Sequence, residues 1–202
     1  MRVVAAAASA AFPIRHSPPE RRPVQRNGFT IIELLIVMTI ILVLAGLILA
    51  TAGYVQKKGA RSRTEAEIAA MSAALESYKA DNGEYPRDPT STDTLDARAP
   101  YDGTRYQAAS LFRYEKLSAT NPDHSVIPNA KSYFAFKPNM LSPRDQSLNT
   151  TAIVDPFGNS YGYSTAKAAN PTANPGYNPT FDLWSTGGVT TGNDQSQWIK
   201  NW

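Results

Sequence analysis

The sequence contains no cysteine and only two histidines, His16 and His124, among its 202 residues. Without cysteine, the chain can form no disulfide bond, no thiolate metal site and no cysteine nucleophile. Two histidines are too few for a metal site built from three histidines. The aromatic content of 10% argues against a wholly disordered chain, and 15 prolines with 12 glycines indicate a portion that is rich in loops.

Most of the chain also lacks a basic excess, although its net charge is +3. Residues 1–28 contain five arginines and a single acid, Glu20. The other 174 residues hold 15 of the 20 basic residues and 16 of the 17 acidic ones, a net charge of −1. The basic character therefore belongs to the N-terminal segment. The remainder shows no electrostatic sign of nucleic-acid binding, and we expect no nucleic-acid partner.

One long apolar run dominates the N-terminal part. Residues 29–50 read FTIIELLIVMTIILVLAGLILA, with no charge from Leu34 onward. As a helix this stretch is about 33 Å long, enough to cross a hydrocarbon core of about 30 Å. A buried core helix is one alternative, but a domain this small could hardly surround a helix that is apolar on all sides. A secretory signal peptide, cleaved near residues 50–53, is another. We expect a single-pass membrane anchor.

The charges that flank this run predict its orientation. The five arginines before it place the N-terminal side in the cytoplasm and the C-terminal bulk outside. Four basic residues after the run reduce this asymmetry: Lys57, Lys58, Arg61 and Arg63. Two acids, Glu65 and Glu67, partly offset them, and we interpret the charges at 61–67 as a solvated helix face.

A single carboxylate, Glu33, lies near the start of the apolar run. A carboxylate in hydrocarbon costs several kcal/mol unless it is neutralised or paired. No lysine or arginine lies between Arg26 and Lys57. Cleavage after Gly28 would create an α-amino group on Phe29 at about the same depth, largely charged at neutral pH. This amine could pair with Glu33 on its own helix or on a neighbouring subunit.

The ten residues 26–35, RNGFTIIELL, resemble the processing motif of type IV pilins and the related pseudopilins. The resemblance implies that a membrane peptidase cuts after Gly28 and methylates the new N-terminus, Phe29. It also implies that Glu33 is needed to recruit subunits during assembly. The leader of 28 residues is longer than most in the family.

Past the membrane the helix is expected to continue as a stem. Residues 54–82 contain no proline and are rich in helix-forming residues. Ile68, Met71, Leu75 and Tyr78 form one apolar stripe at helical spacing, and Asn82-Gly83 supplies a stop. The predicted organisation is a leader at 1–28 that is removed, a transmembrane and assembly helix at 29–53, a helical stem at 54–86 and a periplasmic globular head at 87–202.

The head is expected to add a small antiparallel sheet to this helix, giving an α+β, pilin-like fold. A short helix is predicted at 108–114. Strands are predicted at 131–137, 151–154 and 160–164, with 181–185 as the last strand. Loops are predicted at 87–103 and 170–179. Four segments resemble the major pseudopilins of type II secretion systems: 78–86, 155–161, 181–185 and a closing segment made of 192–194 followed by 199–202. Residues 87–150 are unlike that group.

That group typically binds calcium in the loop after the last strand, so the resemblance implies a Ca²⁺ site here. Asn193 and Asp194 occupy the paired acidic positions, and Thr186 would offer its backbone carbonyl. Val189 stands where the group has an aspartate. One carboxylate does not hold calcium tightly by itself, and a glycine-rich turn without metal is the alternative.

The resemblance implies a structural subunit and not an enzyme. The subunit would be anchored in the inner membrane by one helix, with its head in the periplasm, and would polymerise with its own copies into a pseudopilus for protein export. Implied partners are a prepilin peptidase, the inner-membrane secretion or pilus assembly platform and minor pseudopilins. A type IV pilus subunit for adhesion, motility or DNA uptake is the alternative. The lack of cysteine and the closing segment favour secretion.

Two other classes have weaker support. A membrane-anchored hydrolase could use His124, but this residue lies in a polar loop and the chain has no Gly-x-Ser-x-Gly elbow. An anchored binding module could use scattered tyrosines, which more often serve packing: Tyr101, Tyr106, Tyr114 and Tyr133.

Overall fold

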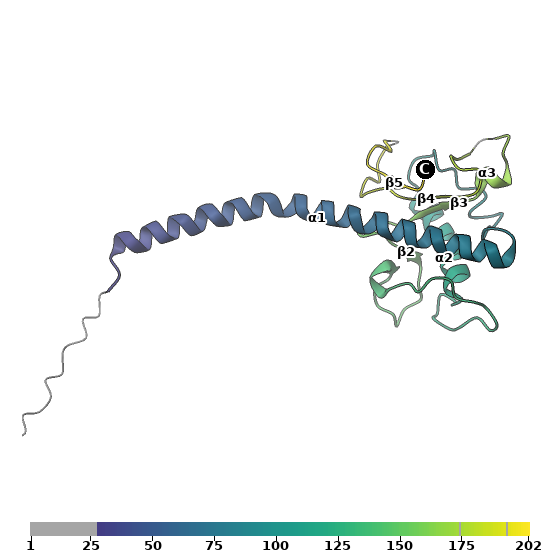
Figure 1. The fold of residues 1–202 in the computed structure, drawn as a ribbon, viewed down its shortest axis with the longest axis horizontal. Coiled ribbons are helices and arrows are strands. Elements are labelled where there is room, and N and C mark those ends of the chain that lie inside the picture. The colour runs from purple at the N-terminus through teal and green to yellow at the C-terminus, as the bar shows by residue number, and fades with distance from the viewer. Residues whose placement is uncertain (1–27, 174, 193) are drawn as a thin grey trace, which may run out of the picture. The chain divides into compact units, whose positions relative to one another are not determined.

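The structure is a computed structural model that describes residues 28–173, 175–192 and 194–202. The leader predicted at 1–28 lies outside these residues except for Gly28. The chain divides into two compact units, one that ends at Leu47 and one that spans Ile48–Trp202. In chain order the elements are α1 (Ile31–Asn82), α2 (Gly103–Ser118), the 3-10 turn η1 (Pro138–Met140), β1 (Leu141–Ser142), β2 (Ala152–Ile153), β3 (Gly162–Ser164), α3 (Ala166–Ala169), β4 (Asp182–Ser185) and β5 (Ile199–Lys200), as Figure 1 shows.

Helix α1 is one helix of 52 residues, which confirms that the apolar run continues into a stem. It ends where the sequence predicts. Gly83 follows Asn82 with a φ of +83°, and its N–H donates to the carbonyl of Lys79 at 2.7 Å. This left-handed conformation suits glycine, because a Cβ atom would be strained there.

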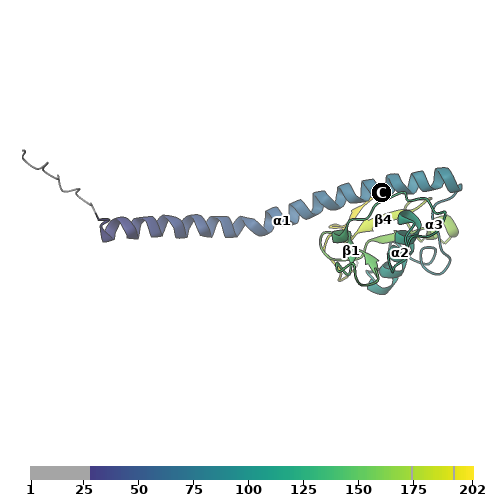
Figure 2. The same ribbon diagram turned by 90° about the horizontal axis from the view of Figure 1, so that it is seen from below.

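In the second unit the stem packs on the head through the predicted stripe. Ile68, Met71 and Leu75 are buried in the main core, and Tyr78 packs against it partly buried. The head contributes Tyr161 and Leu183 to the same core, together with residues of α2 and of the other strands. Figure 2 shows strand β4 between the stem and α2. The predicted α+β architecture, a helix on a small antiparallel sheet, is confirmed.

The strands form two small antiparallel sheets, with the orders β1-β2 and β3-β4-β5. A single bridge, between Val154 and Ser160, joins the end of β2 to the start of β3 across the 155–159 turn. The strand–turn–strand prediction for 151–164 is therefore confirmed. In the larger sheet Gly162 lies opposite Trp184, and Trp184 lies opposite Lys200.

Two strand predictions are wrong. Residues 131–137 form no strand; Tyr133 and Phe134 instead donate their N–H groups to the carbonyl of Leu117, at the end of α2. Their rings pack against the core, so the aromatic content that resembled a strand serves packing in an irregular segment. Residues 181–185 contain β4, but β4 is not the last strand, because β5 pairs with it. The helix predicted at 108–114 is the longer α2.

Candidate functional site

The start of α1 is built as a capping box. Thr30 precedes the helix, and its Oγ1 accepts a hydrogen bond from the N–H of Glu33 at 3.3 Å. In return, Oε2 of Glu33 accepts from the N–H of Thr30 at 2.8 Å and from its hydroxyl at 2.7 Å. This reciprocal pattern satisfies N–H groups that a helix start leaves unpaired. This helix start was not predicted above, although Thr-x-x-Glu is the sequence signature of a capping box.

The two residues expected at the processing point stand before this helix. Gly28 and Phe29 are exposed, and Phe29 is 87% exposed. A Cβ atom built on Gly28 would meet nothing within 4 Å. The Gly28–Phe29 bond therefore lies in exposed, non-helical backbone.

The apolar residues of this unit are exposed all around the helix. Every residue from 28 to 47 is exposed, including the large side chains of Leu34, Ile41 and Leu44. By length and composition α1 contains one candidate membrane span, and none of its most apolar window is buried. The alternative of a buried core helix is therefore wrong. An apolar surface of this size requires lipid or other apolar helices around it.

The family described as "Prokaryotic N-terminal methylation motif" matches residues 24–49. The match includes Gly28, Phe29 and Glu33 and most of the apolar run. The motif supports a type IV pilin-like pseudopilin. The motif, the exposed apolar helix and the small antiparallel sheets of the head agree with this assignment.

Curated relatives resemble the chain over different shares of its length. The "Type II secretion system core protein G" of Pseudomonas aeruginosa is 27% identical over 180 residues, which are 88% of this chain and 96% of that protein. The protein of the same name from Klebsiella michiganensis is 38% identical over 66 residues, 33% of this chain and 46% of that protein. That from Escherichia coli K12 is 36% identical over 62 residues, 31% of this chain and 43% of its own. No solved structure matches the chain.

The loop after β4 contains the residues expected to hold calcium. The carbonyl of Thr186 accepts a hydrogen bond from the N–H of Val189 at 3.1 Å, and Oδ1 of Asp194 accepts from the N–H of Ser196 at 2.9 Å. Asn193 lies outside the described residues. Within the described ranges, the Thr186 hydroxyl is buried without a hydrogen bond, and no group of three or more histidine, aspartate or glutamate side chains could hold a metal.

Calcium requires six to eight oxygen ligands, several of them charged. Asp194 is exposed and is the only carboxylate among the described residues of this loop, so these residues do not fit a tight calcium site. Calcium binding by this loop stays a prediction.

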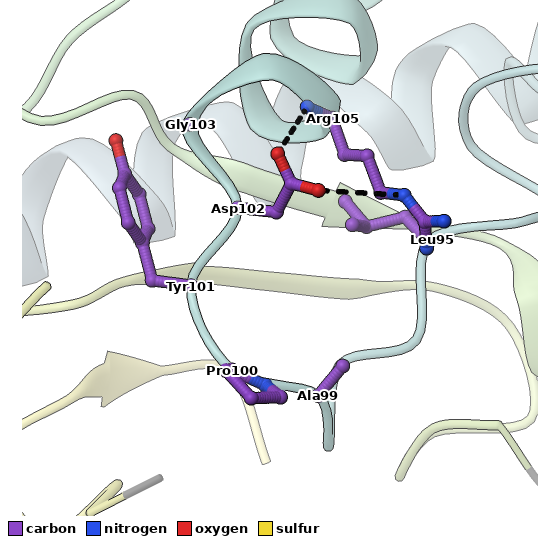
Figure 3. A pocket seen from close by; sticks show the side chains of 7 residues that line it. All are labelled: Leu95, Ala99, Pro100, Tyr101, Asp102, Gly103 and Arg105. Atoms are coloured by element: carbon purple, nitrogen blue, oxygen red, sulfur yellow. Dashed lines mark hydrogen bonds and ion pairs between the residues drawn. The ribbon is translucent and has the colours of Figure 1, made fainter. Parts of the chain in front are cut away.

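A hollow of about 530 Å³ lies at the start of α2 (Figure 3). The charged side chains that line this hollow, Asp102 and Arg105, stabilise the start of α2. Oδ1 of Asp102 caps α2 by accepting from the N–H groups of Thr104 and Arg105, and Oδ2 lies 3.5 Å from Nε of Arg105. Figure 3 shows these two side chains turned toward each other, with Tyr101 on the other side of the loop. The arrangement is that of a capped helix and not of an acid–base pair.

The residues considered for the other two function classes do not form a site. His124 is partly buried with a φ of +66°, and its Nε2 lies 3.0 Å from the carbonyl of Leu148. Tyr106 and Tyr114 are buried in the core, where the hydroxyl of Tyr106 accepts from the indole N–H of Trp184 at 3.0 Å. Tyr133 packs edge-on against Tyr78. The tyrosines therefore stabilise the head.

Proposed function

We propose that this pseudopilin is a structural subunit of the pseudopilus of a type II secretion system. The observation that carries the proposal is the methylation motif at 24–49 joined to a chain that matches the P. aeruginosa core protein G over nearly its whole length. The role is mechanical. Subunits polymerise into a filament that supports protein export, and the chain itself catalyses no reaction.

In this proposal α1 has two successive environments. In the precursor its apolar part crosses the inner membrane once, with the arginine-rich leader in the cytoplasm and the head in the periplasm. In the filament the same surface packs against the helices of neighbouring subunits, because its apolar side chains are exposed and need an apolar environment. The partners are copies of the chain, minor pseudopilins and the inner-membrane assembly platform.

Glu33 is assigned the role of setting the register between subunits. In the precursor its carboxylate accepts hydrogen bonds from Thr30. Cleavage after Gly28 by a prepilin peptidase would create an amine on Phe29, the residue next to Thr30. This amine and the carboxylate of a neighbouring subunit would form an ion pair among apolar helices, which is an attested way to fix a register.

Processing is tested on the protein isolated from membranes. Intact mass and N-terminal sequencing should show a chain that begins at Phe29 and carries one extra methyl group. A mature chain that begins anywhere else contradicts the assignment of Gly28 and Phe29, and with it the proposed ion pair.

Assembly is tested with Glu33→Ala. The variant should remain in the membrane but form no filaments, because the chain that joins the filament loses its register contact. Glu84→Ala is the matched control, since Glu84 is an exposed glutamate outside the apolar run. Normal filaments of Glu33→Ala would overturn the role of the carboxylate.

The type IV pilus alternative predicts a different genetic neighbourhood and is not favoured by the relatives, which are named as secretion proteins. Genes for a secretion ATPase and a secretin beside this gene support the pseudopilus. Pilus genes in their place support the alternative.

A further inference from the structure

Immediately after the apolar run, α1 carries a stripe of basic residues with one tyrosine. Tyr54, Lys57, Lys58 and Arg61 follow one another at spacings of three, one and three residues. Positions i, i+3, i+4 and i+7 lie on one face of a helix. These four residues are called the basic stripe below.

The basic stripe forms one wall of a groove of about 430 Å³ in the second unit. The opposite wall comes from the head: Phe157, Gly187 and Gln197. One contact ties the two walls together, because Arg61 donates from its guanidinium to the carbonyl of Gln197 at 3.0 Å. The groove is therefore a built feature of the stem and head and not a gap beside a free helix.

The head wall leaves room in the groove because it contains glycine. Gly187 has a φ of +62°, and a Cβ atom there would lie 2.4 Å from the carbonyl oxygen of Gln197. A Cβ atom on the adjacent Gly188 would lie 3.3 Å from the ring of Phe157. The groove thus presents a phenyl ring and backbone on one side and cationic side chains on the other.

The lysines of the stripe have no counterion within the described chain. Lys57 and Lys58 are exposed, and neither has an ion pair or a hydrogen bond among the described residues. No acidic residue occurs between Glu33 and Glu65 in the sequence, and Glu65 lies 3.3 Å from Nε of Arg61. These two positive charges are therefore exposed to solvent and unpaired within the described residues.

The position of the stripe along the helix indicates which anionic partner the two lysines meet. A hydrocarbon core of about 30 Å takes about 20 helical residues, which end at Ile48 when counted from Phe29 and at Gly53 when counted from Leu34, the first residue after Glu33. Tyr54 then stands at the membrane–water boundary, where tyrosine is enriched. Lys57 and Lys58 follow about 4.5–6 Å beyond Tyr54 along the axis, at the depth of lipid headgroups, and their long side chains can reach toward phosphates.

We propose that the basic stripe and its groove bind the headgroups of anionic phospholipids in the outer leaflet of the inner membrane. Lys57 and Lys58 would contact lipid phosphates, Tyr54 would lie at the acyl–headgroup boundary, and Arg61 would hold the helix against the head beside the lipid. The contact keeps the head at the membrane surface before assembly. The proposed lipid contact rests on the membrane anchor of the proposed function. It requires neither cleavage after Gly28 nor a filament.

A second copy of the chain fits the groove less well. The charged groups of the groove are all cations, so a protein occupant would have to bring a carboxylate to the level of the apolar run, and Glu33 at the other end of the run is the only acid in residues 29–64. A lipid surface supplies both the acyl chains and the phosphates at that level without any such requirement.

The test uses the full chain in detergent micelles and counts bound lipids by native mass spectrometry. The probes are phosphatidylglycerol and phosphatidylcholine with the same acyl chains. Phosphatidylglycerol should bind at least five-fold more tightly. Lys57→Gln/Lys58→Gln should lose this preference, because each lysine near the anionic surface contributes up to about five-fold.

The matched control is Lys116→Gln/Lys137→Gln, which removes the same charge from exposed sites on the head. It should keep the preference for phosphatidylglycerol. A preference that is absent from the unaltered chain, or equally reduced in the control, overturns the proposal. So does displacement of the lipid by millimolar inorganic phosphate, which would indicate a site for free anions. Carbodiimide cross-links from Lys57 or Lys58 to a second copy would assign the groove to a protein contact and also overturn it.

Discussion

The hydroxyl of Tyr161 donates a hydrogen bond of 2.6 Å to Oε2 of Glu67 and so joins the head to the stem across 94 positions of sequence. Tyr161 is fully buried, while Glu67 is half-buried on α1. The interpretation of residues 61–67 as a solvated face is therefore wrong for Glu67. Burial raises the pKa of Glu67 above its ordinary value of 4.5, and the Tyr161 hydrogen bond opposes this rise.

Tyr161→Phe should destabilise the head by about 1.5–3 kcal/mol, because it removes a hydrogen bond to a carboxyl group that stays half-buried. Thermal unfolding of the detergent-solubilised chain, followed by near-ultraviolet circular dichroism, measures the change. Tyr54→Phe is the control. Tyr54 is 70% exposed, so this substitution should leave the melting temperature nearly unchanged. Equal effects of the two substitutions would contradict the role of this hydrogen bond.

The pH dependence of the same pair has a defined sign. Because the pKa of Glu67 is higher in the folded chain than in the unfolded chain, its contribution to stability is full below about pH 4.5 and is lost as the pH rises through the folded value. Tyr161→Phe removes an interaction that lowers this pKa, so the titration midpoint should move upward. Carboxyl-carbon NMR of Glu67 measures the midpoint, and a downward shift would refute the assignment.

Arg113 is the one fully buried charged side chain among the largest buried residues of the described chain. Its guanidinium makes no hydrogen bond within the described ranges, and it lies 5.6 Å and 5.5 Å from the ring centres of Tyr161 and Tyr163. Burial lowers the pKa of Arg113 to about 10. The cation–π contacts offset only part of the cost of removing this charge from water.

Arg113→Met should therefore be neutral or stabilising, because a flexible apolar side chain fills the space without a buried charge. Arg113→Ala should destabilise the head by about 2–5 kcal/mol, because it leaves a cavity in the main core. Urea unfolding of both variants compares them directly. If Arg113→Met costs as much as Arg113→Ala, the charge itself stabilises the fold.

The long-period features of this fold could be predicted from the sequence. The apolar run and the 68–75 stripe extend over several helical turns, and the processing motif is contiguous in sequence. None of these three features depends on contacts between residues that are distant in sequence. The strands could not be predicted equally well. β1 and β5 are two residues long, too short to show alternation, and they form because β2 and β4 offer them partners.

The buried position of Arg113 had no signal in the sequence. Arginine on a helix is usually exposed, and only the packing of α2 against β2 and β3 places this one among tyrosines. The bond between Glu67 and Tyr161 is hidden for the same reason. The capping box at Thr30 has a local sequence signature, but the charge of Glu33 and its apolar surroundings pointed to an amine on Phe29, of the same helix or of a neighbouring subunit.

The capping box provides a way to separate two roles of Glu33. Glu33→Gln keeps an oxygen that can accept from Thr30 but removes the charge, whereas Glu33→Ala removes both. If the ion pair with the Phe29 amine sets the register, both variants should fail to form filaments, while Thr30→Val, which loses the cap and keeps the charge, should assemble. Electron microscopy of sheared filaments gives the yields. Assembly of Glu33→Gln alone would indicate that Glu33 acts through the helix start.

Calcium should act on the head only weakly. With Asp194 as the only described carboxylate of its loop, we expect chelation to leave the melting temperature unchanged at micromolar calcium. Millimolar calcium, and not magnesium, should raise it, and Asp194→Asn should abolish that rise. Tight stabilisation at micromolar calcium would show that further ligands complete the site.

The pairing of Gly162 with Trp184 leaves no space for a side chain on the β3 residue. A Cβ atom on Gly162 would lie 2.1 Å from Cε2 of Trp184, a ring that is fully buried and held through its N–H to Tyr106. Gly162→Ala should destabilise the head by about 1–3 kcal/mol, because the indole has to shift within a packed aromatic cluster. In a Trp184→Phe background the same substitution should cost less, since the smaller ring leaves space. A double-mutant cycle of urea unfolding free energies measures this coupling, and additive costs would show that the steric conflict is relieved elsewhere.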